Sequence, residues 1–406
     1  MPRASALLAG LGAALALVVL SAQIHGLDLL VYRQGALALL GMAGDQQLYD
    51  PSLIETDTRS LPFTYPPFSA LVFIPLALLP VSGALVVVTA VSLACLLVVA
   101  RWVGRYLADR QALPLWASTR WGKATVLVLL VLLIGVSGPW REGLGFGQIN
   151  PLILVLIVAD LLRPPGRVPR GFLIGIAAGI KLTPLAFGLI FLVRRDWRAI
   201  LALGTGFLAT VGIGWLAAPR ESARFWFGAI GDPARVGDTT DIYNVSLNAF
   251  LAHLGASGAL QRSLWILGSL AVIALGYAAI RRAEDDGDLV RAVTANAVVM
   301  LAISPISWFH HWVWIALLIP AAWVHARNHA GTTRVVEVAF VALLLPVMMF
   351  SSITVTLILT GRVSGDGPPA LELFTSLGVL LPVALLVLWL GPRLSLPSGP
   401  PGGARP

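Results

Sequence analysis

An aspartate, a lysine and a pair of histidines stand out in this sequence because the chain around them is strongly apolar. Asp28 comes almost directly after the first apolar run, in HGLDLLVYRQGALALL. His310 and His311 end the segment SPISWFHH, where a helix is predicted to begin. Histidine titrates near neutral pH, and two adjacent imidazoles cannot both face lipid cheaply. A carboxylate and an imidazole of this kind could supply a general base at a membrane surface.

The stretch around Asp28 predicts an amphipathic helix that lies on the membrane surface. Its lipid-facing residues would be Leu29, Val31, Leu37 and Leu40. An acid between a membrane helix and this interfacial helix would be held rigidly near the headgroups. The alternative is that Asp28 only caps the interfacial helix.

Lys181 lies in the interior of another apolar segment, within the string IKLTP. A charge inside the membrane is costly and usually faces a cavity or a partner, although a lysine can also snorkel to the surface. Pro184 follows shortly afterwards and favours a broken helix. The histidines and Trp308 also have a structural alternative, as interfacial anchors. A zinc site in SPISWFHH is not expected, because consecutive histidines point to different helix faces and no third ligand is nearby.

Two further polar segments are weaker candidates for a site. Gln148 and Asn150 lie in FGQIN, and Asn244 lies with Ser246 and Asn248 in YNVSLNAF. Helix capping would explain either segment.

The elements that must position these residues are membrane helices. The chain has 406 residues, of which 57% are hydrophobic and 12% charged, whereas a soluble domain carries about 25% charged residues. Apolar runs recur throughout, near the length of about 20 residues that crosses a hydrocarbon core or that of a half-crossing segment. They cover residues 4–22, 81–100, 124–136, 149–158, 199–218, 264–280, 335–359 and 377–390. The runs lack the alternation of barrel strands and must therefore be helical.

Counting every apolar run as one crossing gives about twelve helices, with both termini on the inner side. Arg3 places the N-terminus inside, and the arginine clusters at 194–198, 281–282 and 327–334 mark inner loops. The first outer loop, 25–66, contains five of the 20 acidic residues. The other outer segments are 219–261 and 304–311.

The middle of the chain does not fit this count. Basic residues that would fall outside are Arg101, Arg105, Arg110, Arg120, Lys123, Arg163, Arg167 and Arg170. Phe68 to Leu79 is short for a full crossing, and residues 171–193 are interrupted at Lys181 as a re-entrant hairpin would be. The topology of 66–101 and 171–193 therefore stays open.

The net charge of +8 does not indicate a nucleic-acid partner, because the arginines lie in short loops and form no basic stripe. Cys95 is the single cysteine and lies inside an apolar run, so neither a disulfide framework nor a thiolate metal site is expected. The first apolar run is longer than the h-region of a signal peptide, which favours a retained first helix.

Eight strings, in this order, resemble glycosyltransferase family 87, the polyprenol-phosphate-mannose-dependent α-1,2-mannosyltransferases of actinobacteria. The strings are LDLLVY (27–32), LYDP (48–51), FTYPPFSALVFIPLALLP (63–80), GQIN (147–150), IKLTP (180–184), RRDWRA (194–199), NVS (244–246) and SPISWFHHWVW (304–314). Each alone is weakly specific, whereas eight in order cover most of the chain. The type that the sequence resembles most closely extends phosphatidylinositol mannosides.

The resemblance implies an all-α, polytopic transmembrane bundle of the GT-C type, in a single domain over residues 1–395. The Pro/Gly-rich tail, 396–406, is expected to be disordered. The active site is expected on the periplasmic side of the plasma (inner) membrane, beneath the loop 25–66. The implied partners are a polyprenyl-phosphate-sugar donor and a glycolipid acceptor. An acid of the first outer loop is the expected catalytic residue, here Asp28, and because it is a lone aspartate no metal or other cofactor is expected.

The implied donor carries mannose β-linked to a phosphate, which leaves as a weak base and needs no general acid. An α-linked product then requires one in-line displacement with a single base. The expected base is Asp28 or His310, and the other residue would orient the acceptor. Histidine has the better-matched pKa, since an unperturbed carboxylate with a pKa near 3.9 is a feeble base at neutral pH.

The remaining candidates are expected to bind substrate. Lys181 is expected to hold the donor phosphate, with Arg59 as a second possibility. Trp308 could stack on a sugar face. The other expected substrate-binding residues are Tyr65, Gln148, Asn150, Asn244 and His311.

A transporter or flippase of a lipid-linked sugar is the main alternative function, because it would explain many helices, a broken segment and a buried lysine. Transporters usually contain related halves, and the LDLLVY and YPPF strings have no second copy. A membrane scaffold would leave Lys181 and the histidine segment unexplained. The enzyme is therefore the preferred interpretation.

Overall fold

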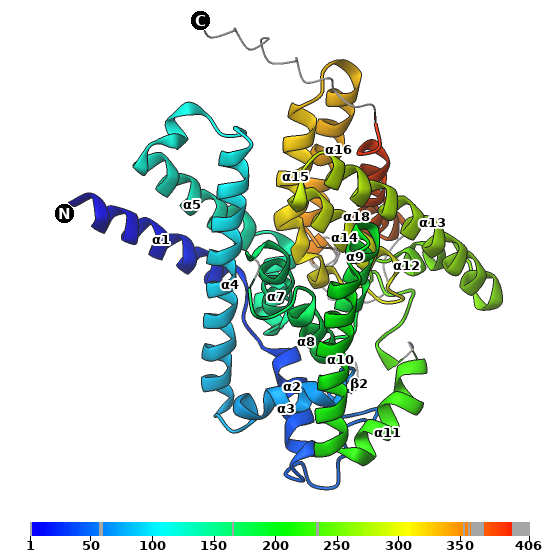
Figure 1. Cartoon of the computed structure of the whole chain (residues 1–406). Coiled ribbons are helices and arrows are strands. Elements are labelled where there is room, and N and C mark those ends of the chain that lie inside the picture. The colour runs from blue at the N-terminus through cyan, green and yellow to red at the C-terminus, as the bar shows by residue number, and fades with distance from the viewer. Residues whose placement is uncertain are drawn as a thin grey trace, which may run out of the picture.

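A computed structural model of the chain describes residues 2–56, 60–164, 166–232, 235–351, 354–355, 358 and 369–391. The regular structure of these residues is helical except for one short antiparallel hairpin (Figure 1). Its strands, β1 (Ile54–Glu55) and β2 (Ser60–Leu61), belong to the first predicted outer loop. The prediction of an all-α fold is therefore confirmed for the described chain.

Within the described residues, five helices are long and apolar enough to cross a membrane: α4 (Val81–Asp109), α10 (Trp197–Ala217), α13 (Gly258–Asp285), α16 (Gly331–Met349) and α18 (Pro369–Leu388). A sixth span results if α5 (Arg120–Gly135) and α6 (Gly138–Phe146), bent by 69°, are one crossing. Shorter apolar helices include α1 (Pro2–Ser21), α3 (Pro67–Ala77), α7 (Asn150–Leu162) and α14 (Leu289–Ile303). The chain is thus a multi-pass helical membrane protein, while the count of about twelve crossings stays a prediction.

The remaining elements are short and connect or flank these helices. They are η1 (Leu115–Ser118), α11 (Pro219–Phe227), η3 (Ala229–Gly231), α12 (Leu247–His253), η5 (Phe309–Trp314) and α15 (Ile315–Arg327). Buried Asp160 organises one connection, because its carboxylate accepts from Gly171 N (2.8 Å) at the start of α8 (Phe172–Ile180) and pairs with Arg163 (2.8 Å). Arg163, one of the basic residues that did not fit the topology count, thus has a buried acidic partner.

The predicted interruption near Lys181 is confirmed. Lys181 follows α8 with an extended backbone (φ −145°, ψ 125°), and the chain then continues as η2 (Thr183–Phe187) and α9 (Gly188–Arg194). The buried helix α14 supports the second half of this break. Its Asn296 accepts from Ile190 N at 3.0 Å and donates to Ala186 O at 3.0 Å. One buried amide thus satisfies backbone groups that the broken helix would otherwise leave unpaired.

The predicted helix after Asp28 exists as α2 (Leu27–Leu39), but the prediction of its lipid-facing side is wrong. Leu29 and Val31 are 0% and 5% exposed, whereas only Leu40 is clearly exposed, at 41%. Leu29 is covered by the turn after α6, where a Cβ added at Gly147 would lie 3.0 Å from the Leu29 Cβ, and Val31 faces an internal cavity. In addition α3 packs on α2, where the Tyr32 ring stacks on Phe73 with centroids 4.4 Å apart. A periodic apolar pattern predicts a buried face but does not say whether lipid or protein covers it.

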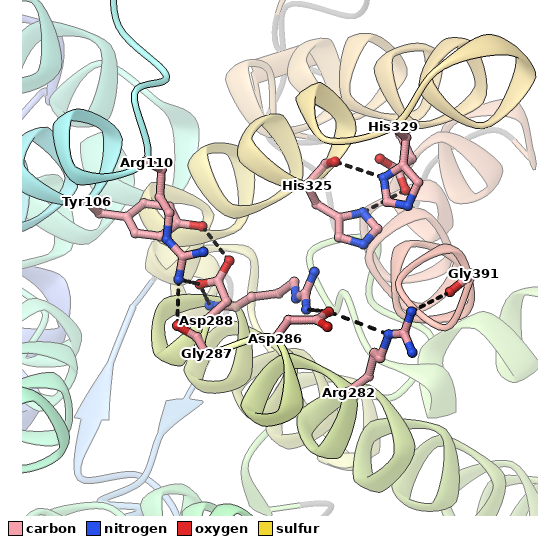
Figure 2. Close-up of polar contacts among 11 residues, drawn as sticks. Tyr106, Arg110, Arg282, Asp286, Gly287, Asp288, His325, His329 and Gly391 are labelled. Carbon is pink, nitrogen blue, oxygen red and sulfur yellow. Dashed lines mark hydrogen bonds and ion pairs between the residues drawn. The ribbon is translucent and has the colours of Figure 1, made fainter. Parts of the chain in front are cut away.

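The position of Arg110 bears on the topology that the sequence left open. Figure 1 shows α4 running from the end that holds α2 and α3 to the opposite end of the molecule. There Arg110 donates to Gly287 O at 2.6 Å and lies 3.8 Å from Asp288, beside the network of Arg282 (Figure 2). Arg110 therefore shares an end with a predicted inner arginine cluster. The eleven-residue α3 lies between the loop 25–66 and α4, and it is too short for a full crossing, which takes about 20 residues.

Candidate active site

A cavity of about 820 Å³ collects most of the residues that the sequence singled out. It lies between the start of α2, the loop before α3, the turn from α6 to α7, the break at Lys181 and the segment before η5. Its wall includes Asp28, Tyr32, Tyr65, Glu142, Gln148, Lys181, Trp308, His310 and His311. The volume lies within the range of about 300–1,000 Å³ that is typical of small-molecule sites.

Asp28 is held in this wall because the backbone just before it is hydrogen-bonded to the end of α6. The amides of His25 and Gly26 donate to the Gly145 carbonyl at 3.0 and 2.8 Å. This close contact requires glycine at 145, since a Cβ there would lie 2.4 Å from the Ala22 carbonyl oxygen. The residue that caps α2 is Gly26, without a side-chain hydrogen bond, so the capping alternative for Asp28 is wrong. The Asp28 carboxylate instead accepts a hydrogen bond from Gln148 Nε2 at 2.5 Å.

Gln148 is the centre of the network, a position that the sequence did not reveal. Its Nε2 contacts both the Asp28 carboxylate and His310 Nε2 (3.1 Å), and its Oε1 accepts from Tyr32 OH at 3.0 Å and from Asn150 Nδ2 at 3.2 Å. The left-handed turn at Gly147 (φ 72°) ends α6 and directs Gln148 toward α2. Capping does not explain Gln148 or Asn150, because Ile149 occupies the N-cap of α7.

Asn150 joins this network to Lys181. Lys181 Nζ donates to Asn150 Oδ1 at 2.9 Å, and Asn150 Nδ2 also donates to the His310 carbonyl at 3.2 Å. Lys181 Nζ lies 3.0 Å from His311 Nε2 and 5.7 Å from the centroid of the Tyr65 ring. The lysine therefore faces the cavity among polar and aromatic partners, and it is not a snorkelling residue. Burial lowers the pKa of Lys181 to about 7, against the opposing effect of Asp28.

The segment that carries the two histidines is fixed by a short antiparallel bridge to residues 243–246. Val245 N donates to Ser307 O at 2.7 Å, and Ser307 N donates to the Asn244 side chain at 2.9 Å. Asn244 is 1% exposed and is absent from the cavity wall, so it positions this segment. Ser246 caps α12 by accepting from Ala249 N at 3.1 Å, as capping predicted for that residue.

Burial reverses the expected order of the two candidate bases. The Asp28 carboxyl group faces the cavity but is enclosed by protein, and this desolvation raises its pKa to about 6. Desolvation, together with the nearby Lys181 charge, lowers the pKa of His310 to about 3. The same causes lower the pKa of His311. Both imidazoles are therefore neutral at physiological pH, and the carboxylate has the pKa better suited to a base.

The cavity wall also contains Tyr32 and Glu142, which were not among the candidates. Tyr32 bonds Gln148 and lies 3.0 Å from Tyr65 through the two hydroxyl groups, and Glu142 of α6 adds a second carboxylate. Glu142 could have been noticed as an acid inside the apolar stretch GPWREGLGF. Arg59, the second candidate for the donor phosphate, lies outside the described residues.

A carboxylate, a lysine and neutral hydrogen-bonding groups thus surround one cavity in a helical membrane protein, and groups of these kinds can support acid–base chemistry. Residues 63–305 match the family described as glycosyltransferase family 87. The chain therefore belongs to glycosyltransferase family 87 and is a glycosyltransferase, as the resemblance of its strings predicted.

Curated relatives agree with this assignment. Two are named polyprenol-phosphate-mannose-dependent alpha-(1-2)-phosphatidylinositol mannoside mannosyltransferase. The protein of Mycolicibacterium smegmatis is 32% identical over 324 residues, covering 76% of this chain and 72% of the relative. That of Mycobacterium tuberculosis is 33% identical over 310 residues, covering 74% and 70%. A third, named as the corresponding pentamannoside mannosyltransferase of Mycolicibacterium smegmatis, is 34% identical over 299 residues, covering 72% and 68%. No solved structure matches the chain.

Proposed function

We propose that this enzyme transfers mannose from a polyprenyl-phosphate-mannose donor to a phosphatidylinositol mannoside, forming an α-1,2 linkage. The names of the relatives support the donor, the acceptor type and the linkage. The observation that carries the site assignment is the single cavity in which Asp28 and His310 share Gln148 as a hydrogen-bonding partner. The transporter alternative has no support from these relatives, all of which are named as transferases.

The proposed reaction is one in-line displacement. The acceptor hydroxyl oxygen attacks the anomeric carbon while the bond from this carbon to the phosphate oxygen breaks, so that polyprenyl phosphate leaves with the electron pair. Asp28 takes the proton of the attacking hydroxyl group. The leaving phosphate needs no proton, in contrast to the leaving group of an ordinary glycoside.

The other polar residues have supporting roles in this proposal. Gln148 holds the carboxylate and places the neutral His310 where its imidazole orients the acceptor. Lys181 holds the donor phosphate, because an ammonium group in a low-dielectric cavity stabilises the growing negative charge. His311 and Asn150 position the lysine. Tyr65 and Trp308 offer aromatic faces to the sugar, and Glu142 offers hydrogen-bond acceptors to its hydroxyl groups.

The membrane setting is part of the proposal. We infer a GT-C-type bundle of about twelve helices in one domain, 1–395, in the plasma (inner) membrane. The cavity would face the periplasm beneath the loop 25–66. Thr56, Leu61, Thr64 and Tyr65 of that loop line the cavity, which supports this placement. Residues 396–406 lie outside the described residues.

Mannose transfer in reconstituted vesicles tests the function. Purified full-length enzyme is given polyprenyl-phosphate-[14C]mannose and phosphatidylinositol mannoside, and the labelled glycolipid is separated and its linkage determined. We expect an α-1,2-linked product with wild-type enzyme and with Asp45→Asn, a control acid that is exposed in the same loop. Asp28→Asn should form no product above background. Product formation by Asp28→Asn at the wild-type rate would remove the assignment of the base.

A further inference from the structure

A second cluster of polar side chains lies far from the cavity and has no part in the proposed transfer. It comprises His325 near the end of α15, His329 just after that helix, and Glu337 in α16. Figure 2 shows His325 and His329 beside the paired charges of the end that holds Arg110. That end is remote from the cavity, because α4 passes Gly26 at Leu85 and reaches Arg110 on the order of 40 Å further along its axis.

The three side chains converge on one point. His325 Nδ1 lies 2.8 Å from Glu337 Oε1, and one potential ligand atom from each residue lies within 4.8 Å of the other two. His329 Nδ1 lies 2.9 Å from the His325 carbonyl oxygen and must donate to it, since a carbonyl only accepts. The proton of a neutral His329 is therefore on Nδ1, and the Nε2 lone pair is free. A backbone carbonyl that fixes the tautomer in this way is the usual outer partner of a metal-ligating histidine.

An independent observation points to a missing cation. Glu337 is 1% exposed, and its Oε2 is buried without a hydrogen-bond partner among the described residues. A buried carboxylate oxygen without a donor is costly, and buried charges are normally paired or bound to metals. The Arg291 guanidinium does not fill this role, because it pairs with Asp286 at 2.5 Å and donates no hydrogen bond to Glu337 Oε2, although its own Nε is buried without a partner among the described residues.

The ligand types select the ion. Two imidazole nitrogens and one carboxylate oxygen suit Zn²⁺, whereas Mg²⁺ and Ca²⁺ prefer sets made of oxygen alone. Zinc ligands lie at about 2.0–2.2 Å from the ion, so the side chains would draw slightly closer on binding. Half-exposed His329 follows the last turn of α15 and has the freedom to do so. Three protein ligands leave a fourth position for water.

We propose that His325, His329 and Glu337 form a Zn²⁺ site that joins the end of α15 to α16. The ion takes the place of the proton between His325 Nδ1 and Glu337, whose unpartnered Oε2 can also bind it, and this proton moves to Nε2 of the neutral imidazole. Since α15 directly follows the segment that carries His310, the ion would stiffen the helix behind the cavity without touching substrate. The site is independent of the transfer chemistry.

Zinc binding to tag-free, full-length enzyme in detergent tests the proposal. The protein is first stripped with a chelator, and zinc is then titrated against a competing fluorescent indicator while thermal unfolding is followed in parallel. We expect the wild type to bind one equivalent and to unfold at a higher temperature with zinc. Glu337→Gln, which keeps the shape and an acceptor for His325, and His329→Ala should each bind zinc at least tenfold more weakly.

The matched control is His253→Ala, because His253 is also hydrogen-bonded but lies on α12, outside the cluster. This variant should bind zinc as the wild type does. Unfolding temperatures without zinc show whether each variant is folded. The proposal is wrong if folded wild type binds no stoichiometric zinc, or if Glu337→Gln and His329→Ala bind it as tightly as His253→Ala.

Discussion

The two ends of this protein handle buried charge in opposite ways. At the Arg110 end, acids and bases meet directly, as in Arg291–Asp286 at 2.5 Å and Arg194–Glu284 at 2.7 Å. At the cavity, Asp28 and Lys181 are instead linked through two neutral amides, Gln148 and Asn150. Direct pairs satisfy one another and stabilise the fold, whereas charges kept apart by amides stay available to a substrate. Under the proposed function, the cavity end serves the chemistry and the other end serves stability.

The largest effect should come from neutralising the acid of the cavity. Asp28→Asn keeps the shape of the side chain but removes the base, so the transfer rate should fall by about 10²- to 10⁴-fold. The measurement is single-turnover mannose transfer in vesicles. Donor binding should be nearly unchanged, since the substituted amide still fills the same place in the wall. A rate within threefold of wild type would mean that the Asp28 carboxylate is not needed for transfer, and would contradict the contrast between the two ends.

Removing the cation of the cavity should come second. Lys181→Met should lower the transfer rate by about 10²- to 10³-fold, as expected for the loss of a group that stabilises a leaving anion. It should also weaken binding of polyprenyl phosphate itself, measured by competition with labelled donor. Lys123→Met is the matched control, because Lys123 is exposed. Equal donor binding in both variants would argue against a phosphate role for Lys181.

A subtler change concerns the amide between the two candidate bases. The hydrogen bond from Gln148 lowers the pKa of Asp28 against the larger effect of burial. Gln148→Met removes this bond, so the pKa of Asp28 should rise further. Because the carboxylate form is the base, the acidic limb of the pH–rate profile should move to higher pH. An unchanged acidic limb would mean that the group titrating in the profile is not the carboxylate hydrogen-bonded to Gln148.

The smallest effect is expected at the other end. Tyr106 donates to Asp288 at 3.0 Å there, so Tyr106→Phe should lower the free energy of unfolding by about 1 kcal/mol. The transfer rate per folded molecule should be unchanged. Thermal unfolding in detergent and the vesicle assay measure the two quantities, with exposed Tyr277→Phe as the control. A loss of transfer that exceeds the loss of folded protein would contradict the separation of the two ends.

The sequence predicted the membrane class, the family and most of the residues around the cavity, because each is a polar exception in an apolar chain. Asp28, Lys181 and His310 could be recognised in this way without knowing their neighbours. Their roles stay predictions, and the central place of Gln148 was missed. Its partners Asp28, Tyr32 and His310 each lie more than a hundred residues from it in the sequence, and only the folded chain brings them together.

Predictions were wrong where one local sequence pattern is compatible with more than one arrangement in the folded chain. The apolar face with Leu29 and Val31 was expected against lipid, but protein covers it. Histidine was the better base by its ordinary pKa, and burial reverses this order because desolvation raises the pKa of a carboxyl group and lowers that of an imidazole. Neither outcome can be obtained from spacing alone.

The pH dependence of kcat/KM tests most directly whether the carboxylate, and not the imidazole, is the base. The pKa of Asp28 is raised to about 6, so transfer should decline as the pH falls through about 6. On the alkaline side it should decline as Lys181, whose pKa burial lowers to about 7, loses its proton. The isosteric variant His310→Gln should be slower but should keep the same acidic limb. If the limb disappears in His310→Gln while the wild type retains it, the titrating base is the histidine and the proposed role of Asp28 is wrong.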